Sequence, residues 1–347
     1  MIKIAVIHAP YLPVPDNAQP GNAGYRDANA LDYVNSNIEK TLSKIEEAGK
    51  NGADICCTHE DFVNSGGYGW YIVDRPDLYP YLVEQTFGEV RKLFGAAAKK
   101  YSMMIAANNY ESDGGKIYNT STLYGRDGSI IGRYRKVHLP AGERWHVTAG
   151  SEFPVFKTDI GNIGFMTCYD VFFPETCRIL ALNGADIVIH QTQGWGLNGK
   201  EKDGMGGIVG EAFMRVRSSE NSVYLVTSKV IQDNGKDGGR SVVTDNCGRI
   251  LADSGPDEEK IIYAEFEPDF NITDRYAYNS FFSGIPEVRA QYALSRRPET
   301  YAAFTDKNPE VLNRFPGMRF MDRPGEPEKI IKFQQTITEE ERRKYHW

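Results

Sequence analysis

The order in which strand and helix signals alternate is the feature that most constrains the fold of this chain. A buried strand is expected at Ile2–His8, and a helix at Asp27–Lys50, where apolar residues recur at three- and four-residue steps. Asn51-Gly52 ends that helix, and a second strand follows over residues 53–58. Strand, helix and strand joined in this way form the βαβ unit of a layered α/β protein.

Further along the chain, hairpin signals are mixed with such units. Asp-Gly at 127–128 and the segment 159–162 each join two predicted strands into a hairpin. Hairpins beside βαβ units imply mixed sheets, and the strand count predicts an α/β fold with two mixed β-sheets face to face and helices outside. The remaining helices are expected at 87–101, 174–182 and 208–221, and the strands at 103–108, 120–125, 129–139, 153–158, 163–168, 185–190, 223–228, 240–244, 249–252 and 261–267.

The predicted elements end near residue 275. From about Tyr276 the composition shifts toward Arg, Pro and Tyr. We therefore expect one domain over residues 1–275. Residues 276–347 are interpreted as a C-terminal extension that packs on the core or on a partner subunit.

Charge and apolar runs exclude several function classes. The chain has 40 basic and 47 acidic residues without a Lys/Arg cluster, so neither nucleic acid nor a membrane is expected as a partner. The apolar run at residues 2–7 is too short for a secretion signal or a membrane span, and no later run is long enough. Five cysteines without a spacing pattern indicate reduced thiols in the cytoplasm. The histidines do not cluster, so no metal is expected.

Reactive side chains stand at or just beyond the ends of predicted strands: Glu60, Lys136, Glu143 and Cys168. Strand ends are where α/β proteins collect functional groups, because the sheet is rigid and the loops give access. A structural cysteine, a solvent-facing lysine and solvated loop carboxylates are the ordinary alternatives. Alternation places Tyr134, Lys136 and His138 on one strand face but does not say which face is buried.

The residues after Cys168 favour a functional cysteine. The strand ends at Thr167, Tyr169-Asp170 turns the chain, and Pro174 suits the first position of a helix. A thiol at such a strand-to-helix corner lies near backbone N–H groups, which stabilise a thiolate and an oxyanion.

Three motifs, in this order and spacing, resemble the nitrilase superfamily of carbon–nitrogen hydrolases. They are Thr58-His59-Glu60, Tyr-Arg-Lys-x-His-Leu at 134–139, and Gly-x-x-x-Cys-Tyr-Asp-x-x-Phe-Pro-Glu at 164–175. The resemblance runs from Ile2 to about Glu267, and residues 296–301 are similar to a family tail pattern. It implies a four-layer αββα sandwich for the 1–275 carbon–nitrogen hydrolase domain, a homodimer or higher homo-oligomer, and no cofactor.

The resemblance also implies a role for each reactive residue. Cys168 would be the nucleophile, Glu60 the general base and acid, and Lys136 a stabiliser of the oxyanion. Glu143 would orient Lys136 or the substrate amine. Together they would hydrolyse a C–N bond through a thioester and release ammonia.

The residues after the nucleophile bear on the substrate. Cys168-Tyr169-Asp170 is similar to the amidase and N-carbamoyl hydrolase branches, whereas true nitrilases typically have Cys-Trp-Glu. A small linear amide or ureido substrate is therefore expected. Val171 and Phe172 stand where carbamoyl-amino-acid hydrolases often place arginines, so that sign of a substrate carboxylate is missing. The side chains expected to bind substrate, with ordinary packing as the alternative for each, are Tyr68, Trp145, Tyr169 and Trp195.

Three other functions stay open on the sequence. A nitrilase would convert a nitrile to an acid and ammonia. A Cys–His hydrolase would use His138 or His190 in place of the lysine and glutamate. A protein of the same fold without catalytic activity would only bind its ligand.

Overall fold

The computed structural model describes residues 1–71, 75–140, 142–194, 205–231, 240–256, 258–270, 288–307 and 309–311. The chain divides into two compact units. The core unit comprises Met1–Leu139 and His146–Phe270, and the second unit comprises Pro140–Trp145 and Asn271–Trp347. Trp195, one of the expected substrate-binding residues, lies outside the described residues.

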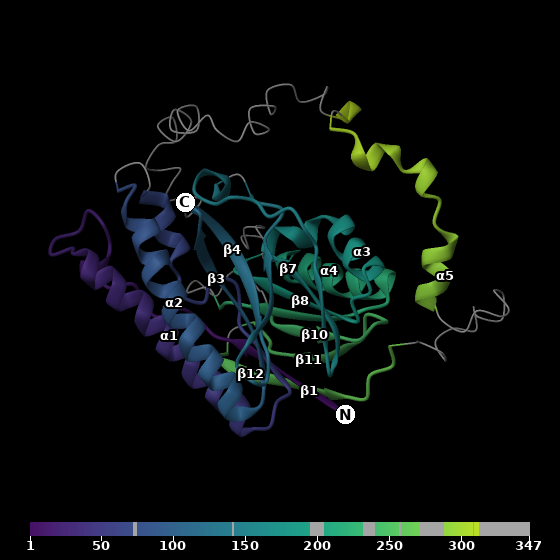
Figure 1. The fold of residues 1–347 in the computed structure, drawn as a ribbon, viewed down its shortest axis with the longest axis horizontal. Helices are drawn as coiled ribbons and strands as arrows, with labels where there is room; N and C mark the ends of the chain where they lie inside the picture. The colour runs from purple at the N-terminus through teal and green to yellow at the C-terminus, as the bar shows by residue number, and fades with distance from the viewer. Residues whose placement is uncertain are drawn as a thin grey trace. The chain divides into compact units, whose positions relative to one another are not determined.

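The first sheet of the core unit has six strands in the order β12-β1-β2-β3-β4-β5. β12, β1, β3 and β4 are labelled in Figure 1. β1 pairs in parallel with β2, and β2 with β3, whereas the other pairs are antiparallel. The sheet is therefore mixed, as the combination of βαβ and hairpin signals predicted. Its strands are β1 (Ile2–His8), β2 (Ile55–Cys57), β3 (Met104–Asp113), β4 (Lys116–Tyr124), β5 (Ile130–Arg135) and β12 (Lys260–Phe266).

The second sheet also has six strands, in the order β11-β10-β9-β8-β7-β6. β7, β8 and β9 run parallel to one another. β6 pairs antiparallel with β7, β10 with β9, and β11 with β10. Its strands are β6 (Val155–Thr158), β7 (Gly161–Thr167), β8 (Ile187–Thr192), β9 (Tyr224–Lys229), β10 (Val242–Thr244) and β11 (Ile250–Asp253).

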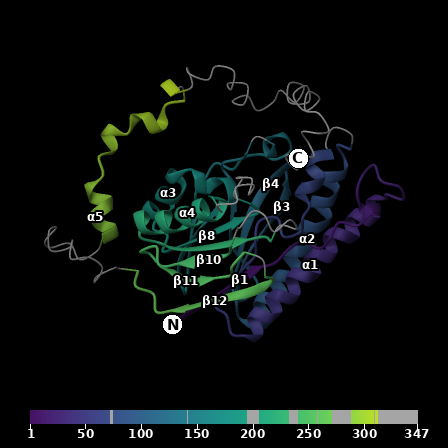
Figure 2. The same cartoon turned by 180° about the vertical axis from the view of Figure 1, so that it is seen from behind.

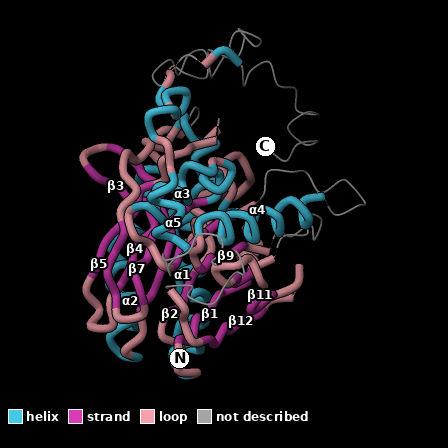
Figure 3. The backbone as a smooth tube through the Cα atoms, turned by 90° about the vertical axis from the view of Figure 1, so that its right-hand side faces the viewer, coloured by secondary structure: helices cyan, strands magenta, loops and turns pink. Residues whose placement is uncertain are grey.

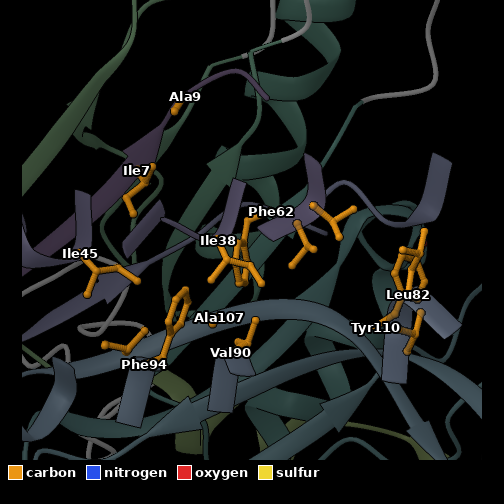
Figure 4. Close-up of a cluster of buried hydrophobic side chains, with 14 of the residues drawn as sticks. Ile7, Ala9, Ile38, Ile45, Phe62, Leu82, Val90, Phe94, Ala107 and Tyr110 are labelled. Carbon is orange, nitrogen blue, oxygen red and sulfur yellow. The ribbon is translucent and has the colours of Figure 1, made fainter. Parts of the chain in front are cut away.

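Two pairs of helices cover the outer faces of the two sheets (Figure 2). α1 (Asp27–Lys50) and α2 (Leu78–Tyr101) pack on the first sheet through one buried apolar cluster, part of which Figure 4 shows. α3 (Pro174–Leu182) and α4 (Met205–Asn221) lie against the second sheet through another cluster. The order helix, sheet, sheet, helix is the expected αββα sandwich.

A third apolar cluster fills the space between the two sheets. β1 illustrates how the sequence supplies it. Ile4 and Val6 face the second sheet, while Ala5 and Ile7 face the helices, because successive strand residues point to opposite faces. A strand buried on both faces is largely apolar, which explains the run Ile4-Ala5-Val6-Ile7 near the start of the chain.

Some element boundaries differ from expectation. β1, α1 and α3 have the predicted ends, but α2 begins at Leu78 rather than at residue 87. Pro80 lies in its first turn, where a missing N–H costs no hydrogen bond, so the proline does not delay the helix. β5 ends at Arg135, and Lys136 therefore follows the strand instead of lying within it.

The described part of the second unit is short. It contains the 3-10 turn η3 (Glu143–Trp145), the helix α5 (Val288–Ser295), and the 3-10 turns η6 (Pro298–Thr300) and η7 (Ala302–Thr305). The limits of the expected domain and extension, 1–275 and 276–347, stay a prediction. Among the helices that the structure describes, none combines the length and apolar character needed to cross a bilayer.

Candidate active site

Cys168 lies where β7 ends and a short 3-10 helix, η4 (Cys168–Phe172), begins. Figure 3 labels β7 and α3, the elements before and after this 3-10 helix. α3 follows from Pro174, so the half-buried thiol stands at the expected strand-to-helix corner. Its backbone φ of +46° is in the left-handed region, which costs on the order of 1–3 kcal/mol for a residue with a Cβ. The Sγ donates a hydrogen bond to the carbonyl oxygen of Gly194 at 3.7 Å. Strain of this kind is typical of functional corners.

Glu60 and Lys136 form a buried ion pair. The Lys136 Nζ lies 2.9 Å from the Glu60 Oε1, and the two side chains are 2% and 4% exposed, lysine first. Glu60 comes three residues after the end of β2, and Lys136 directly follows β5. Tyr134 and Lys136 are both buried, and the solvent-facing alternative for Lys136 is therefore wrong.

Two further donors hold the Glu60 carboxylate. The Asn119 Nδ2 donates to Oε1 at 2.9 Å, and the backbone N–H of Gln193 donates to Oε2 at 2.9 Å. These described contacts give Oε1 two donors and Oε2 one. Because hydrogen bonds to a charged acceptor are the stronger kind, they fix the orientation of the carboxylate.

Hydrogen bonds link this pair to Cys168 across the two sheets. Glu60 accepts from Gln193, and the neighbouring Gly194 accepts from the Cys168 Sγ, so both reactive groups contact one two-residue segment after β8. On the other side, a hydrogen-bonded chain joins Glu60 to the residue before the nucleophile. Its members in order are Glu60, Asn119, Asn108, Ser121 and Thr167. The structure therefore brings Glu60, Lys136 and Cys168 together.

Replacing Asn119 by alanine is expected to lower kcat by about 10- to 100-fold, because a hydrogen bond to a charged group is worth ~1.5–3 kcal/mol. Steady-state kinetics on any accepted substrate measures the effect. Asn109→Ala is the matched control: Asn109 is also buried on a first-sheet strand, but its amide donates to the carbonyl of Tyr110. Equal kcat losses in both variants would contradict a specific contribution of Asn119.

The remaining predicted site residues have different surroundings. Tyr68 lies in the apolar cluster under α1 and α2, where its hydroxyl donates to the Ala18 carbonyl at 3.0 Å. Tyr169 is half-buried, and its ring contacts the rings of Phe172 and Phe173.

Two other predicted residues belong to the second unit. Glu143, which is buried, and Trp145, which is half-buried, form the ends of η3. The expected roles of Glu143 and of all four aromatic residues stay predictions.

The two histidines of the Cys–His alternative bind other groups. The His138 Nδ1 lies 2.8 Å from the Asp170 Oδ1. The His190 Nε2 lies 3.2 Å from the backbone oxygen of Cys168, and its Nδ1 lies 3.4 Å from the Thr227 Oγ1. Burial lowers the pKa of His190 to about 4. Both nitrogens of His190 are therefore engaged, which favours glutamate over histidine as the base.

Two buried histidines are expected to make the protein less stable in acid. Burial lowers the pKa of His59 and of His190 to about 4, from the ordinary value of about 6.5 for an exposed histidine. Below pH 6.5 the unfolded chain binds protons that the folded protein does not. Each histidine therefore lowers the free energy of unfolding by ~1.4 kcal/mol per pH unit as the pH falls toward 4. Burial raises the pKa of Asp61 to about 7, which acts in the opposite sense but is one group against two.

Urea unfolding between pH 6.5 and 4.5 checks this expectation. The free energy of unfolding should fall with pH in the unmodified protein and fall less steeply in His190→Gln, whose amide keeps a donor for the Cys168 carbonyl. An unchanged slope in the variant would show that His190 does not titrate in this range.

The contacts of Glu60 also bear on what the site can hold. Its carboxylate oxygens face an ammonium, an amide and a backbone N–H, all of which are donors. Within the described ranges, no group of three or more His, Cys, Asp or Glu side chains is placed to hold a metal ion.

Asn119 and Gln193 were not predicted from the sequence. Asn119 and Ser121 share one face of β4, and both take part in the polar chain between the sheets. Gln193 follows β8, whose last residues include the polar Gln191. Polar side chains at the ends of otherwise apolar strands were the available signal, but their spacing does not name the group that they contact.

The fold and this site match one protein family. A sequence profile of the carbon–nitrogen hydrolases matches residues 28–273, which is well over half of the chain. The chain therefore belongs to the carbon–nitrogen hydrolase family, the nitrilase superfamily that its motifs resemble.

The names of the relatives in this family indicate different substrates. A citrullinase from Francisella tularensis is 29% identical over 280 residues, covering 76% of this chain and 91% of that protein. An omega-amidase from Mus musculus is 29% identical over 244 residues, and a nitrilase from Pyrococcus abyssi is 30% identical over 234 residues. Each of these two alignments covers 67% of this chain and 83% of the relative.

A solved structure supports the architecture. The carbon–nitrogen hydrolase from Helicobacter pylori G27 superposes with a TM-score of 0.68 at 23% identity, over 88% of this chain and 98% of that one. At 23% identity, this similarity supports the fold alone.

Proposed function

We propose that the protein hydrolyses a non-peptide C–N bond in a small linear amide or N-carbamoyl (ureido) compound and releases ammonia through a thioester on Cys168. The observation that carries the proposal is the buried Glu60–Lys136 pair, whose carboxylate shares the 193–194 segment with the Cys168 thiol. Family membership supports the reaction class.

In the proposed acylation, Glu60 takes the thiol proton while Sγ forms a bond to the substrate carbonyl carbon. Oε2 accepts one described hydrogen bond and Oε1 accepts two, so Oε2 is the oxygen with the more available lone pair for this proton. The tetrahedral intermediate places negative charge on the former carbonyl oxygen. As it collapses, the C–N bond breaks and Glu60 passes its proton to the leaving nitrogen, which departs as ammonia.

Deacylation reverses these roles. Glu60 takes a proton from water, the hydroxide attacks the thioester carbon, and the C–S bond breaks. The proton then returns to the thiolate. An amide yields a carboxylic acid, and a ureido compound yields a carbamic acid.

Two groups support the oxyanion. The Lys136 ammonium is buried, where its charge is less screened than in water. The second is the backbone N–H after Cys168, at the start of η4. Loss of one such donor typically lowers the rate by ~10²–10³-fold. Glu143 is proposed to orient Lys136 or the substrate amine.

Similarity to a citrullinase and an omega-amidase favours ureido or amide substrates, and similarity to a nitrilase keeps the nitrile alternative open. We propose that Tyr169, Trp195, Trp145 and Tyr68 contact the substrate. Tyr68 would do so through its ring, because its hydroxyl donates to the Ala18 carbonyl.

An ammonia-release screen of linear amides, N-carbamoyl amino acids and nitriles tests the proposal, with Cys168→Ala run in parallel. Turnover of amides or ureido compounds is expected. Turnover of nitriles alone would instead identify a nitrilase. No Cys168-dependent turnover of any class would leave the binding-protein alternative.

The same assay separates the glutamate–lysine site from a Cys–His hydrolase. A Cys–His enzyme would lose acylation in His138→Ala and keep it in Lys136→Ala. The buried Glu60–Lys136 pair predicts loss in the lysine variant.

We further propose that the protein is a homodimer or a higher homo-oligomer, in which residues 276–347 pack on the core or on a partner subunit. Light scattering of the full chain and of a chain ending at residue 275 would test this. An unchanged monomeric mass in both would contradict it.

A further inference from the structure

Asp170 lies two residues after Cys168, and its carboxylate is fully buried. Its Oδ2 accepts hydrogen bonds from the Tyr134 hydroxyl at 2.6 Å and from the backbone N–H of Thr167 at 2.8 Å. Its Oδ1 accepts from the backbone N–H of His138 at 3.0 Å and from the Nδ1 of the same residue at 2.8 Å. A carboxylate offers about four acceptor positions, so this group is fully engaged.

The donors come from the two segments that carry the reactive residues. Tyr134 and His138 stand on either side of Lys136, and Thr167 directly precedes Cys168. The Tyr134 hydroxyl also accepts the backbone N–H of Val137 at 3.2 Å. The carboxylate therefore ties the end of β5, on the first sheet, to the end of β7, on the second.

We propose that Asp170 is a positioning residue that sets the distance between Lys136 and Cys168 without touching the substrate. This inference rests on the proposed function of that site. It gives the aspartate of the Cys-Tyr-Asp motif a structural reason: its buried carboxylate, two residues after the nucleophile, fixes the position of the segment that carries Lys136. Since its acceptor positions are taken, Asp170 has none to offer a substrate.

Asp170→Asn tests the proposal, because an amide group of the same shape replaces one acceptor oxygen by a donor. We expect kcat to fall on the order of 10²-fold, the effect of displacing a reacting group by about 1 Å, with KM little changed. A purely structural role would lower the folded fraction and leave the kcat of the folded protein unaltered.

Asp245→Asn is the matched control. Asp245 is also a buried carboxylate that accepts two backbone N–H groups and one side-chain donor, but these lie in the β10–β11 hairpin. A similar loss of stability with unchanged kcat is expected there. Wild-type kcat in folded Asp170→Asn would overturn the proposal, as would an equal kcat loss in both variants.

A second readout needs no substrate. The thiolate fraction of a cysteine depends on nearby cations, and displacing Lys136 should lower that fraction for Cys168. If the fraction falls about tenfold, iodoacetamide should alkylate Cys168 about tenfold more slowly in Asp170→Asn. Peptide mass identifies the modified cysteine. Slower alkylation together with an inactive wild type would support the positioning role and refute the proposed reaction. An unchanged rate would overturn the positioning role.

If Asp170→Asn does not fold, Tyr134→Phe tests the same proposal, because it removes one of the four donors to the Asp170 carboxylate and keeps the aromatic ring. The same readouts apply, and we expect a smaller decrease of kcat in the same direction. Wild-type kcat and alkylation in this variant would overturn the proposal.

Discussion

Replacing Cys168 by alanine is expected to reduce ammonia release by roughly 10⁴-fold or more, the scale on which a hydrolase loses activity without its nucleophile. The thiol is the group placed to form the thioester, and alanine leaves only the electrostatic part of the site. The fold should be kept, because the side chain is half-buried and the substitution removes a single sulfur atom. Initial rates and far-ultraviolet circular dichroism measure the two effects separately.

Cys247→Ala is the appropriate control for this prediction. Cys247 is likewise half-buried, but it lies in the turn between β10 and β11. This variant should keep wild-type kcat. Intact-mass measurement during turnover should reveal an acyl adduct in the unmodified protein and in Cys247→Ala, and none in Cys168→Ala. Full activity of Cys168→Ala would exclude the thioester route.

The second large effect is expected from Lys136→Met, which keeps the aliphatic stem and removes the charge. Turnover should fall by ~10²–10³-fold, because one oxyanion donor is lost. The free energy of unfolding should also fall by about 3–5 kcal/mol, because the buried Glu60 carboxylate loses its cation. Urea unfolding at pH 7 gives the stability, and rates corrected for the folded fraction give the activity.

A double-mutant cycle separates these two effects. Glu60→Gln combined with Lys136→Met replaces the ion pair by two neutral side chains and should regain most of the lost stability while staying inactive. If the double variant were as unstable as Lys136→Met alone, the destabilisation would come from lost packing instead of an unpaired charge.

Much of the fold could be predicted because apolar periodicity and turn residues mark several of its helices and strands. β1 and α1 were delimited correctly, since Ile2–His8 is mostly apolar and Asn51-Gly52 ends the helix. The start of α2 was missed by nine residues; its first turn contains Pro80, which is harmless at that position. The pairing order of the strands depends on contacts far apart in the chain, which local patterns do not contain.

The candidate site was likewise predicted only in part. Position at strand ends made Glu60, Lys136 and Cys168 candidates but left an ordinary alternative for each, and the three motifs in their order singled them out. Their partners could not be predicted. Asn119 reaches Glu60 only after two strands pair and a hairpin closes, and the four donors of Asp170 come from two different sheets.

The pairing of β1 with β12 has a consequence for synthesis of the protein on the ribosome. β1 leaves the ribosome before the other strands of its sheet, yet its antiparallel neighbour is Lys260–Phe266. Until that segment has left the exit tunnel, the nascent chain presents β1 with one edge unpaired, and such edges attract other chains. Every proposed catalytic residue has been made by then, but the sheet that supports Glu60 is incomplete. A chain terminated before residue 260 should therefore accumulate as inactive aggregate, despite carrying the whole reactive set.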